Sequence, residues 1–313
     1  MLHALSVLVL LLCWTSQVWA TTRYASPGAS GGLPCPRNAP CSVRTCIEAT
    51  FAGDQCFLRA GTYDVSIRTS DMAIRSGTSD SNRVVIAGDP ADPPQSAIIR
   101  PTSGGVVIGV EWNQATSYVT FENMVLDAGG ISGDGINSQG PDVHHIRWKD
   151  LEVKNAMGMG PSCGLGGPES CPGKNGVDGH SEGNGGHHQE FLNLKVHHNG
   201  FNRLSHNMYM VCNDCIVDGG EYYDSEGYGL QIYNSACGGT GCNHRFIVRN
   251  VKVHDNRGDG GLTVNYGNDI KVYNNLIYNN NSGGIRAICY GNTNNTQIYN
   301  NTFYGNNGAG LEI

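Results

Sequence analysis

One recurring pattern limits what this chain can fold into. Between His244 and Ile313 the segments HRFIVRNVKVHDN, DIKVYNNLIYNN and NTQIYNNTFYGN follow one another, each with an Asn near its middle. The same register extends back through the anchors Asn123, Asp150, Asn193, Gly219, Asn250, Asn274 and Asn300, spaced 27, 43, 26, 31, 24 and 26 residues apart. A period of roughly 25 residues is typical of a solenoid, whose units bury their apolar faces only against their neighbours.

Two columns of apolar residues keep a constant distance from these anchors. Two positions before the anchor lie Phe121, Trp148, Phe191, Val217, Val248, Val272 and Ile298. Three positions after it lie Leu126, Val153, Val196, Tyr222, Val253, Ile277 and Phe303. Short β-branched and aromatic runs broken by Asn and Gly predict strands rather than helices.

Three short strands account for each repeat. One precedes the anchor, one follows it, and a third begins at a Gly-apolar step such as Gly261-Leu262 or Gly284-Ile285. We expect the anchor at a tight turn, because Asn tolerates the left-handed conformation and stacked amides can bond from coil to coil. The sequence therefore predicts an all-β fold, a parallel β-helix.

The beginning of this pattern resembles a known superfamily. Residues 23–67 include Tyr24–Pro27, Ala52-Gly53-Asp54 and Gly61-Thr62-Tyr63. In these motifs the chain resembles secreted right-handed parallel β-helix proteins of the pectate-lyase-like superfamily. That superfamily includes pectate, alginate and chondroitin lyases, glycosidases, epimerases and phage tailspikes, so the resemblance is specific for the fold and much less so for the activity.

A capping helix is expected ahead of the coils. Val43, Ile47 and Phe51 are near helical spacing within Val43–Ala52. Such a segment can cover the apolar end of the first coil. We expect one domain over residues 21–313, with its capping region at about 21–60, since no linker divides it.

The first twenty residues predict export. They contain no Lys, Arg, Asp or Glu, and an apolar run from Leu5 to Leu12 is followed by Val18-Trp19-Ala20. This pattern is typical of a signal peptide cleaved after Ala20, with an uncleaved membrane anchor as the alternative. We expect a secreted or extracellular protein, or a periplasmic one, without membrane contact after cleavage. The chain has a net charge of -7, and its sequence contains no stripe of basic residues. These features exclude nucleic acid as a partner.

Cysteine spacing agrees with export. Of the 12 Cys, Cys13 lies in the expected signal peptide, and ten others form local pairs, namely Cys35 with Cys41, Cys46 with Cys56, Cys163 with Cys171, Cys212 with Cys215 and Cys237 with Cys242. In an exported chain such pairs predict disulfides, which leaves Cys289 unpaired. A zinc site at Cys212-x-x-Cys215 is the alternative, although no second matching ligand pair is present.

The resemblance places a substrate groove along one sheet, and by register this sheet begins at the Gly-apolar step. Its outward column is Asn137, Asp178, Tyr209, Gln231, Thr263, Arg286 and Glu312, and the next outward positions are Gln139, His180, Val211, Tyr233 and Asn265. Polar and aromatic side chains on a rigid sheet suit an extended sugar chain. We expect a polysaccharide to contact Asn137, Asp178, His206, Gln231, Tyr233 and Arg286. The alternative is that an exposed strand face is polar without binding anything.

Removal of a proton beside a uronate carboxylate requires a neutralising group, a base and an acid. Arg203, Lys174 or Gln231 can neutralise the carboxylate. His180 or Lys174 can take the proton, and Tyr209 can serve as the acid. These residues predict a polysaccharide lyase acting on a uronic-acid-containing chain of the pectate or alginate type.

Other chemistry remains open. A Ca²⁺ ion held by Asp178 with Asp224, Glu226 or Asp259 can replace the neutralising group. A glycoside hydrolase would need paired carboxylates, such as Asp178 with Asp134 or Glu226. A noncatalytic carbohydrate-binding or surface-structural protein is the further alternative, because no single lyase motif is intact.

The repeat continues to the end of the sequence. Gly310-Leu311 opens another strand, and nothing after Asn268 departs from the pattern. Repeat arrays need atypical terminal units, because a bare coil exposes apolar surface and unpaired strand edges. We expect further sequence or a partner subunit to cover this end, and otherwise self-association through it.

Overall fold

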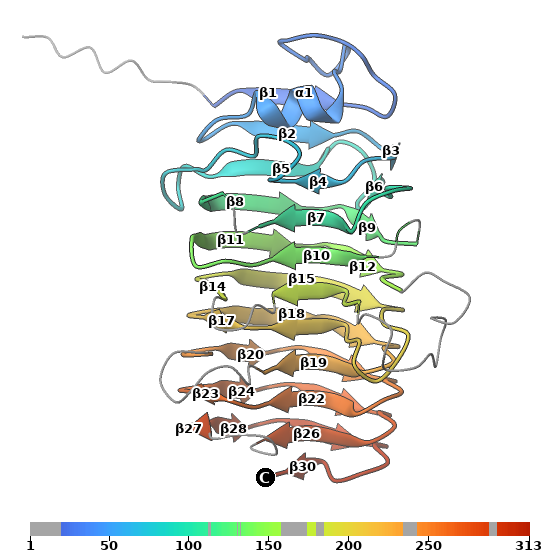
Figure 1. Cartoon of the computed structure of the whole chain (residues 1–313), viewed down its shortest axis with the longest axis vertical. Coiled ribbons are helices and arrows are strands. Elements are labelled where there is room, and N and C mark those ends of the chain that lie inside the picture. Colours follow the sequence, from blue (N-terminus) through green and yellow to red (C-terminus); the bar gives the residue numbers. More distant parts are fainter. Residues whose placement is uncertain are drawn as a thin grey trace, which may run out of the picture.

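The computed structural model describes residues 20–111, 114–129, 131, 133–157, 174–179, 185–233, 243–287 and 293–313. The chain winds into a stack of coils with α1 at one end and β30 at the other (Figure 1). All pairings between its strands are parallel, apart from one isolated antiparallel bridge between Gln139 and Gly185. The predicted parallel β-helix is confirmed. His180 and the cysteine pairs Cys163 with Cys171 and Cys237 with Cys242 lie outside the described residues, as do Cys289 and residues 1–19.

The larger sheet, here called sheet 1, contains the strands on both sides of each anchor. They are β1 Thr22–Ala25, β2 Gln55–Leu58, β3 Gly61–Tyr63, β5 Val84–Gly88, β6 Ala97–Ile99, β8 Thr116–Glu122, β9 Val125–Asp127, β11 Val143–Lys149, β12 Glu152–Lys154, β14 Gly186–His187, β15 Glu190–His197, β17 Cys212–Asn213, β18 Ile216–Tyr223, β20 Ile247–Arg249, β21 Lys252–His254, β24 Lys271–Tyr273, β25 Leu276–Tyr278, β28 Gln297–Tyr299 and β29 Thr302–Tyr304. A small pair of strands, β23 Gly267–Asn268 and β27 Thr293–Asn294, lies apart from it.

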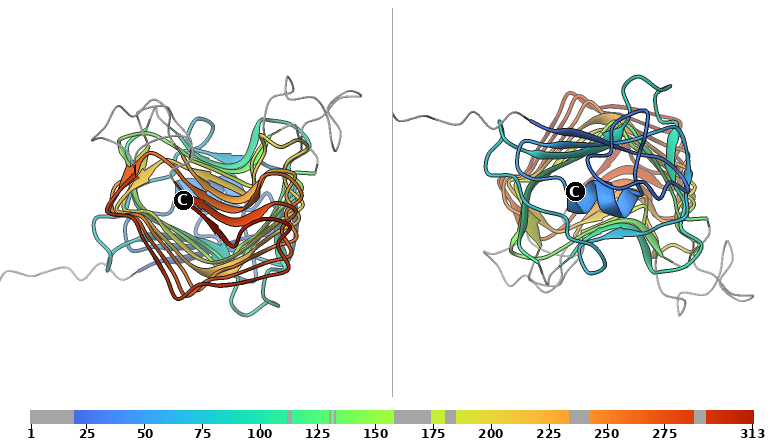
Figure 2. Two further views of the ribbon diagram at one scale, coloured as in Figure 1. Left: turned by 90° about the horizontal axis from the view of Figure 1, so that it is seen from below. Right: turned by 90° about the horizontal axis from the view of Figure 1, so that it is seen from above.

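The second sheet, here called sheet 2, closes each coil. Its strands are β4 Ile67–Arg68, β7 Val106–Val110, β10 Asp134–Ser138, β13 Val177–Gly179, β16 Met208–Met210, β19 Tyr228–Ile232, β22 Gly260–Val264, β26 Gly283–Ala287 and β30 Leu311–Glu312. Each strand is hydrogen-bonded to its counterpart in the next coil, and views along the stack show the coils superimposed (Figure 2).

The anchors form the corners predicted for them. All seven have φ between 51° and 73°, the left-handed region that Asn and Gly adopt most readily. At one corner the side-chain amide of Asn193 donates to Asp150 Oδ1 over 2.7 Å, so anchors also bond from coil to coil.

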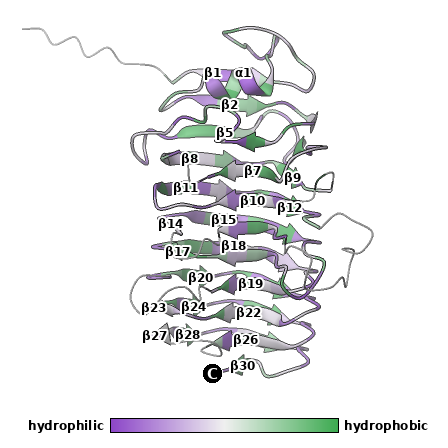
Figure 3. Cartoon of the chain, in the orientation of Figure 1, coloured by the Kyte–Doolittle hydropathy of each residue, from purple (hydrophilic) through white to green (hydrophobic). Residues whose placement is uncertain are grey.

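Both apolar columns point into the core. Phe121, Trp148 and Phe191 are paired in register and fully buried, and the Phe121 and Trp148 rings stack with centroids 4.7 Å apart. The last members, Ile298 and Phe303, are only partly buried. Hydrophobic and hydrophilic residues are mixed within the same strands in Figure 3, since alternate side chains face opposite sides of a strand.

Buried asparagine amides form a ladder inside the coils. Asn256 Nδ2 donates to Asn280 Oδ1 at 2.9 Å, and Asn280 Nδ2 donates to Asn306 Oδ1 at 3.0 Å. The same amides donate to backbone carbonyls, such as that of Val253 from Asn280. The ladder satisfies polar groups that are shielded from water.

The helical cap is shorter than the prediction. α1 spans Val43–Glu48, with Ser42 as N-cap accepting from the Thr45 N–H at 3.1 Å. Ile47 is buried against the first coil, but Phe51 lies beyond the helix, 52% exposed, with the Arg75 guanidinium over its ring. The right-hand view of Figure 2 shows α1 across the end of the stack.

Three predicted disulfides are present, Cys35–Cys41, Cys46–Cys56 and Cys212–Cys215. The third replaces the zinc alternative at Cys212 and Cys215. Within the described segments, no helix has both the length and the apolar character needed to cross a membrane. At the other end Tyr304 is 50% and Leu311 37% exposed, and self-association there stays a prediction.

Candidate functional site: a groove on sheet 2

The outward column of sheet 2 follows the predicted register. Strand pairing aligns Asn137, Asp178, Tyr209, Gln231, Thr263, Arg286 and Glu312 in one row. Their inward neighbours Val177, Leu230 and Ile285 are buried. The inward and outward sets are therefore the predicted ones.

A groove of about 400 Å³ opens over the middle of this column. It is lined by Arg203, Leu204, His206, Tyr209, Tyr228, Gln231, Tyr233, Asp259, Thr263 and Asn265. The structure thus brings together six residues that the sequence singled out, namely Arg203, His206, Tyr209, Gln231, Tyr233 and Asp259.

The turn before β16 carries one wall of the groove. Asn202 Oδ1 accepts from the Leu204 N–H at 3.0 Å and from the Ser205 hydroxyl at 3.2 Å. The His206 N–H donates to Asn175 Oδ1 at 2.8 Å. These bonds hold the turn in place, so Arg203 projects from a supported backbone, with its Nη1 3.8 Å from Asp259 Oδ2.

His206 is oriented by the backbone beside it. The ring is 3% exposed, and its Nδ1 accepts from the Tyr228 N–H at 2.9 Å. A neutral ring in this position carries its proton on Nε2. Its centroid lies 5.5 Å from that of Tyr209, edge to face. His206 can therefore donate from Nε2, but it cannot accept a proton at Nδ1 without losing the bond to Tyr228.

Tyr228 is a groove residue that the sequence did not single out as functional. It is the buried first residue of β19, and its hydroxyl accepts from Arg286 Nη1 at 3.1 Å. Burial disfavours the charge on Arg286, but hydrogen bonds to Glu312 and Tyr228 raise its pKa above the usual range. Arg286 thus supports Tyr228 instead of lining the groove as predicted. The pairing joins side chains 58 residues apart, so no local pattern reveals it.

Two polar side chains of the groove are held by a hydrogen bond between them. Asn265 is fully buried, and its Nδ2 donates to the buried Thr263 hydroxyl at 2.6 Å. Both residues were predicted to lie at outward positions of the sheet that carries the groove. They line the groove together with Tyr233 and Asp259. The hollow therefore combines aromatic rings with fixed polar groups.

Other predicted site residues lie outside this groove. Asn137 and Asp178 occupy the same outward column on the preceding coils. Lys174 lies near the groove, because its backbone N–H donates to Ser205 Oγ at 3.3 Å in the turn before β16. The predicted base His180 lies outside the described residues.

The four residues predicted to bind calcium are not brought together. Asp224 and Glu226 both form ion pairs with Arg257, and Asp224 also lies 2.8 Å from His198 Nε2. Asp178 is three strands away from the Asp259 coil in sheet 2, roughly 14 Å at normal strand spacing. Across the described ranges, no three His, Cys, Asp or Glu converge as metal ligands. This donor set does not fit the ion.

Asp134, a carboxylate of the hydrolase alternative, is buried at the start of β10. Burial raises its pKa to about 6, although the Asn175 N–H donates to Oδ1 at 2.8 Å and Lys174 is nearby. It does not line the groove, and Glu226 is paired with Arg257. Neither predicted partner of Asp178 is therefore placed in the groove.

Comparison with known proteins agrees with this architecture. Residues 175–313 match the family model "Right handed beta helix region". The fold resembles an alginate lyase from Paenibacillus sp. str. FPU-7, with a TM-score of 0.50 and 14% identity over 92% of this chain and 99% of that one. It also resembles XylC, solved in complex with xylose, with a TM-score of 0.53 and 9% identity over 93% of this chain and 68% of that one. No curated protein matches the sequence significantly.

These matches show a fold and no specific reaction. The chain has the fold of a right-handed parallel β-helix.

Proposed function

We propose that the sheet 2 groove binds a uronic-acid-containing polysaccharide and cleaves it by β-elimination. The observation that carries the proposal is the convergence of Arg203, Tyr209 and the Tyr228–Arg286 pair on one hollow. A cation, aromatic rings and hydrogen-bonding groups on a rigid sheet meet the needs of an acidic sugar chain.

The reaction requires three events around one uronate residue. A base removes the proton at C5, and the electron pair left behind forms the C4=C5 double bond. The C4–O4 bond breaks, and an acid gives a proton to the departing oxygen. A cation beside the carboxylate stabilises the negative charge that develops as C5 loses its proton.

The groove offers a residue for each event. Arg203 is the neutralising cation, because its side chain is 53% exposed and faces the groove beside Asp259. Tyr228 is the base, because the hydrogen bond from Arg286 stabilises its phenolate form. Tyr209, one strand away in the same sheet, is the acid. His206 positions Tyr209 and donates from Nε2.

The hydrolase alternative has less support. Hydrolysis of a glycoside uses two carboxyl groups on either side of the bond. Of the groove-lining residues that the structure describes, Asp259 is the one with a carboxylate. This arrangement favours elimination over hydrolysis.

We also propose that the protein acts outside the cell. The disulfides Cys35–Cys41, Cys46–Cys56 and Cys212–Cys215 are typical of oxidising compartments. An alginate lyase and XylC, solved in complex with xylose, share this fold, which supports a carbohydrate as the partner.

Polygalacturonate, alginate and glycosaminoglycans are the substrates to offer. Elimination creates an unsaturated uronate that absorbs in the ultraviolet, and we expect this absorbance to rise with at least one of them. Arg203→Ala should abolish the increase, whereas Arg245→Ala, an exposed cation paired with Asp214 elsewhere, should retain it. New reducing ends without absorbance would assign a hydrolase, and binding without cleavage would assign a noncatalytic protein.

A further inference from the structure

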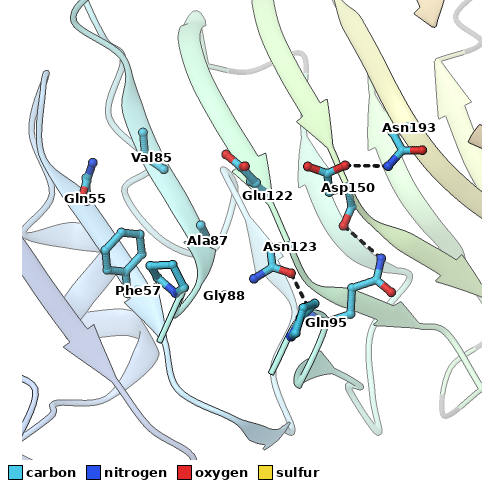
Figure 4. A pocket seen from close by; sticks show the side chains of 12 residues that line it. Gln55, Phe57, Val85, Ala87, Gly88, Gln95, Glu122, Asn123, Asp150 and Asn193 are labelled. Carbon is cyan, nitrogen blue, oxygen red and sulfur yellow. Dashed lines mark hydrogen bonds between the residues drawn. The ribbon is translucent and has the colours of Figure 1, made fainter. Parts of the chain in front are cut away.

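A second hollow lies on the outward face of sheet 1, in the N-terminal half of the stack. Two cavities make it up, one of about 550 Å³ and one of about 400 Å³. Both are lined by Gln55, Val85 and Glu122, so they adjoin, and the two together are here called the sheet 1 trough. Figure 4 looks into the larger cavity.

One wall of the trough is the loop between β5 and β6, and both ends of this loop are fastened. Near β5, Asp92 accepts from the side chain of Arg59 at 3.0 Å and from the Ala60 N–H at 2.8 Å. At the other end, the Gln95 N–H donates to Asn123 Oδ1 at 2.9 Å, and Gln95 Nε2 donates to the Asp150 carbonyl at 3.1 Å (Figure 4). The wall is therefore fixed against the coils that it overhangs.

The opposite wall is fixed by a buried cation. Arg83 is 7% exposed, and its guanidinium donates to the carbonyls of Val119 and His145 and to the carboxylate of Asp80. It ties the loop before β5 to the two following coils. A cavity with two walls already in place loses little conformational entropy on binding a ligand.

The apolar part of the trough is compact. Its side chains are Phe57, Val85, Ala87, Pro90 and Pro94. Phe57 and Ala87 are paired in register on β2 and β5 and face outward, and Phe57 is only partly buried. A ring and two prolines in one hollow provide a surface for the C–H face of a sugar ring.

The trough is lined by equal numbers of carboxylates and cations. Its carboxylates are Asp80, Glu122 and Asp150, and its cations are Arg83, Arg147 and Lys149. Lys149 Nζ lies 2.5 Å from Glu122 and 3.5 Å from Asp150, while Arg147 binds Glu190 at 2.5 Å. Because each charge is already compensated, the trough favours a ligand that offers hydrogen bonds without a net charge.

The topology argues against a peptide strand in this place. β5 is hydrogen-bonded to β2 and to β8, and β8 is also hydrogen-bonded to β11. The floor therefore presents no unpaired edge for strand addition. The side-chain amides of Gln55, Gln95 and Asn193 each make one hydrogen bond within the protein, and their further donor and acceptor capacity suits hydroxyl groups.

We propose that the sheet 1 trough is a second carbohydrate site and that it takes a neutral oligosaccharide. The apolar patch contacts the ring faces, and the amides and ion pairs bind the hydroxyl groups. This site lies on the other sheet from the groove of Arg203 and Tyr209, and the inference does not depend on the reaction proposed there.

The test measures binding of cellohexaose, xylohexaose, mannohexaose and chitohexaose to the full chain by calorimetry and by protein NMR. At least one should bind, and its affinity should be insensitive to salt because it has no charge. Phe57→Ala should weaken binding at least tenfold, and Val85→Trp, which fills the shared part of the trough, should abolish it. Tyr299→Ala is the matched control, an aromatic in the same outward column beyond the trough, and should leave binding unchanged.

Three outcomes would overturn the inference. They are no binding by any of the four hexasaccharides, equal binding by Phe57→Ala and the wild type, or binding that Arg203→Ala abolishes. The last outcome would place the neutral ligand in the sheet 2 groove. Melting curves of each variant show whether the outward substitutions leave the fold intact.

Discussion

Arg286 on β26 donates a hydrogen bond to the phenol oxygen of Tyr228 on β19, two strands away in sheet 2. The donor is a permanent cation, and the acceptor is a buried residue of the groove wall. This contact places a positive charge directly beside the hydroxyl group of one aromatic side chain of the groove.

Replacement of Arg286 by Gln tests the role of Tyr228. Without the cation the phenolate form is less stable, so kcat should fall about tenfold or more, and the rising limb of its pH profile should move to higher pH. Tyr228→Phe should remove the activity at every pH. An unchanged pH profile in Arg286→Gln would assign the base to another residue.

Gly227→Ala tests the orientation of His206. A Cβ at this position would lie 2.4 Å from His206 Nδ1 and 2.4 Å from the Ser205 carbonyl oxygen. The imidazole and the turn that carries Arg203 must therefore shift, and we expect kcat/KM to fall at least tenfold. Gly105→Ala, where no atom lies within 4 Å of the added Cβ, is the control and should retain full activity.

A cluster of four imidazoles predicts sensitivity to acid. His144 stacks on His187 at 4.8 Å, and His145 stacks on His188 at 4.7 Å. Burial, together with the neighbouring imidazoles, lowers the pKa of His144, His145 and His187. Since the unfolded chain then binds protons more readily than the folded one, stability should be full above about pH 6.5 and should fall as the pH drops below it.

Urea unfolding at about pH 7.5 and about pH 5 measures this effect. His187→Gln should reduce the difference in unfolding free energy between the two conditions. His244→Gln, outside the cluster, should leave that difference unchanged. Equal acid sensitivity in both variants would show that other groups cause it.

Asn280→Ala tests the internal amide ladder. It removes the donor to the Val253 carbonyl and the acceptor of Asn256 Nδ2, both in buried surroundings. We expect a loss of about 1–3 kcal/mol in unfolding free energy. The adjacent Asn281→Ala, whose amide forms an exposed bond to the Arg257 carbonyl, should cost less than about 0.5 kcal/mol. Similar losses in the two variants would contradict the importance of the ladder.

The sequence period predicted the structural features that recur in every coil. The corners at Asn193 and Asn250 and the inward placement of Val248 and Val272 follow from a constant spacing and from the alternation of side chains along a strand. The row from Asp178 through Tyr209 to Gln231 follows in the same way, because parallel strands in register align equivalent residues.

Contacts that do not recur from coil to coil could not be predicted from the sequence period. The position of Phe51 outside the helix depends on where α1 ends, and sequence patterns place helix ends least accurately. The contact of Arg83 with the His145 carbonyl joins residues 62 apart through a loop that belongs to no repeat. The Tyr228–Arg286 bond depends on the reach of a long side chain across two coils. The sheet 1 trough and the Tyr228–Arg286 contact therefore emerge only in three dimensions, whereas six residues of the sheet 2 groove followed from the register.

The corner at Asp150 and the next one at Asn193 are separated by 43 residues, yet Trp148 and Phe191 pair as closely in register as their counterparts on the neighbouring coils. The coil therefore keeps its strand register across one long connection. Variation at that connection can alter what the surface contacts while the supporting backbone stays the same. For protein engineering, the connection between β12 and β13 is accordingly a place where a foreign binding segment can be grafted. Its effect on binding can then be measured separately from its effect on the stability of the coils.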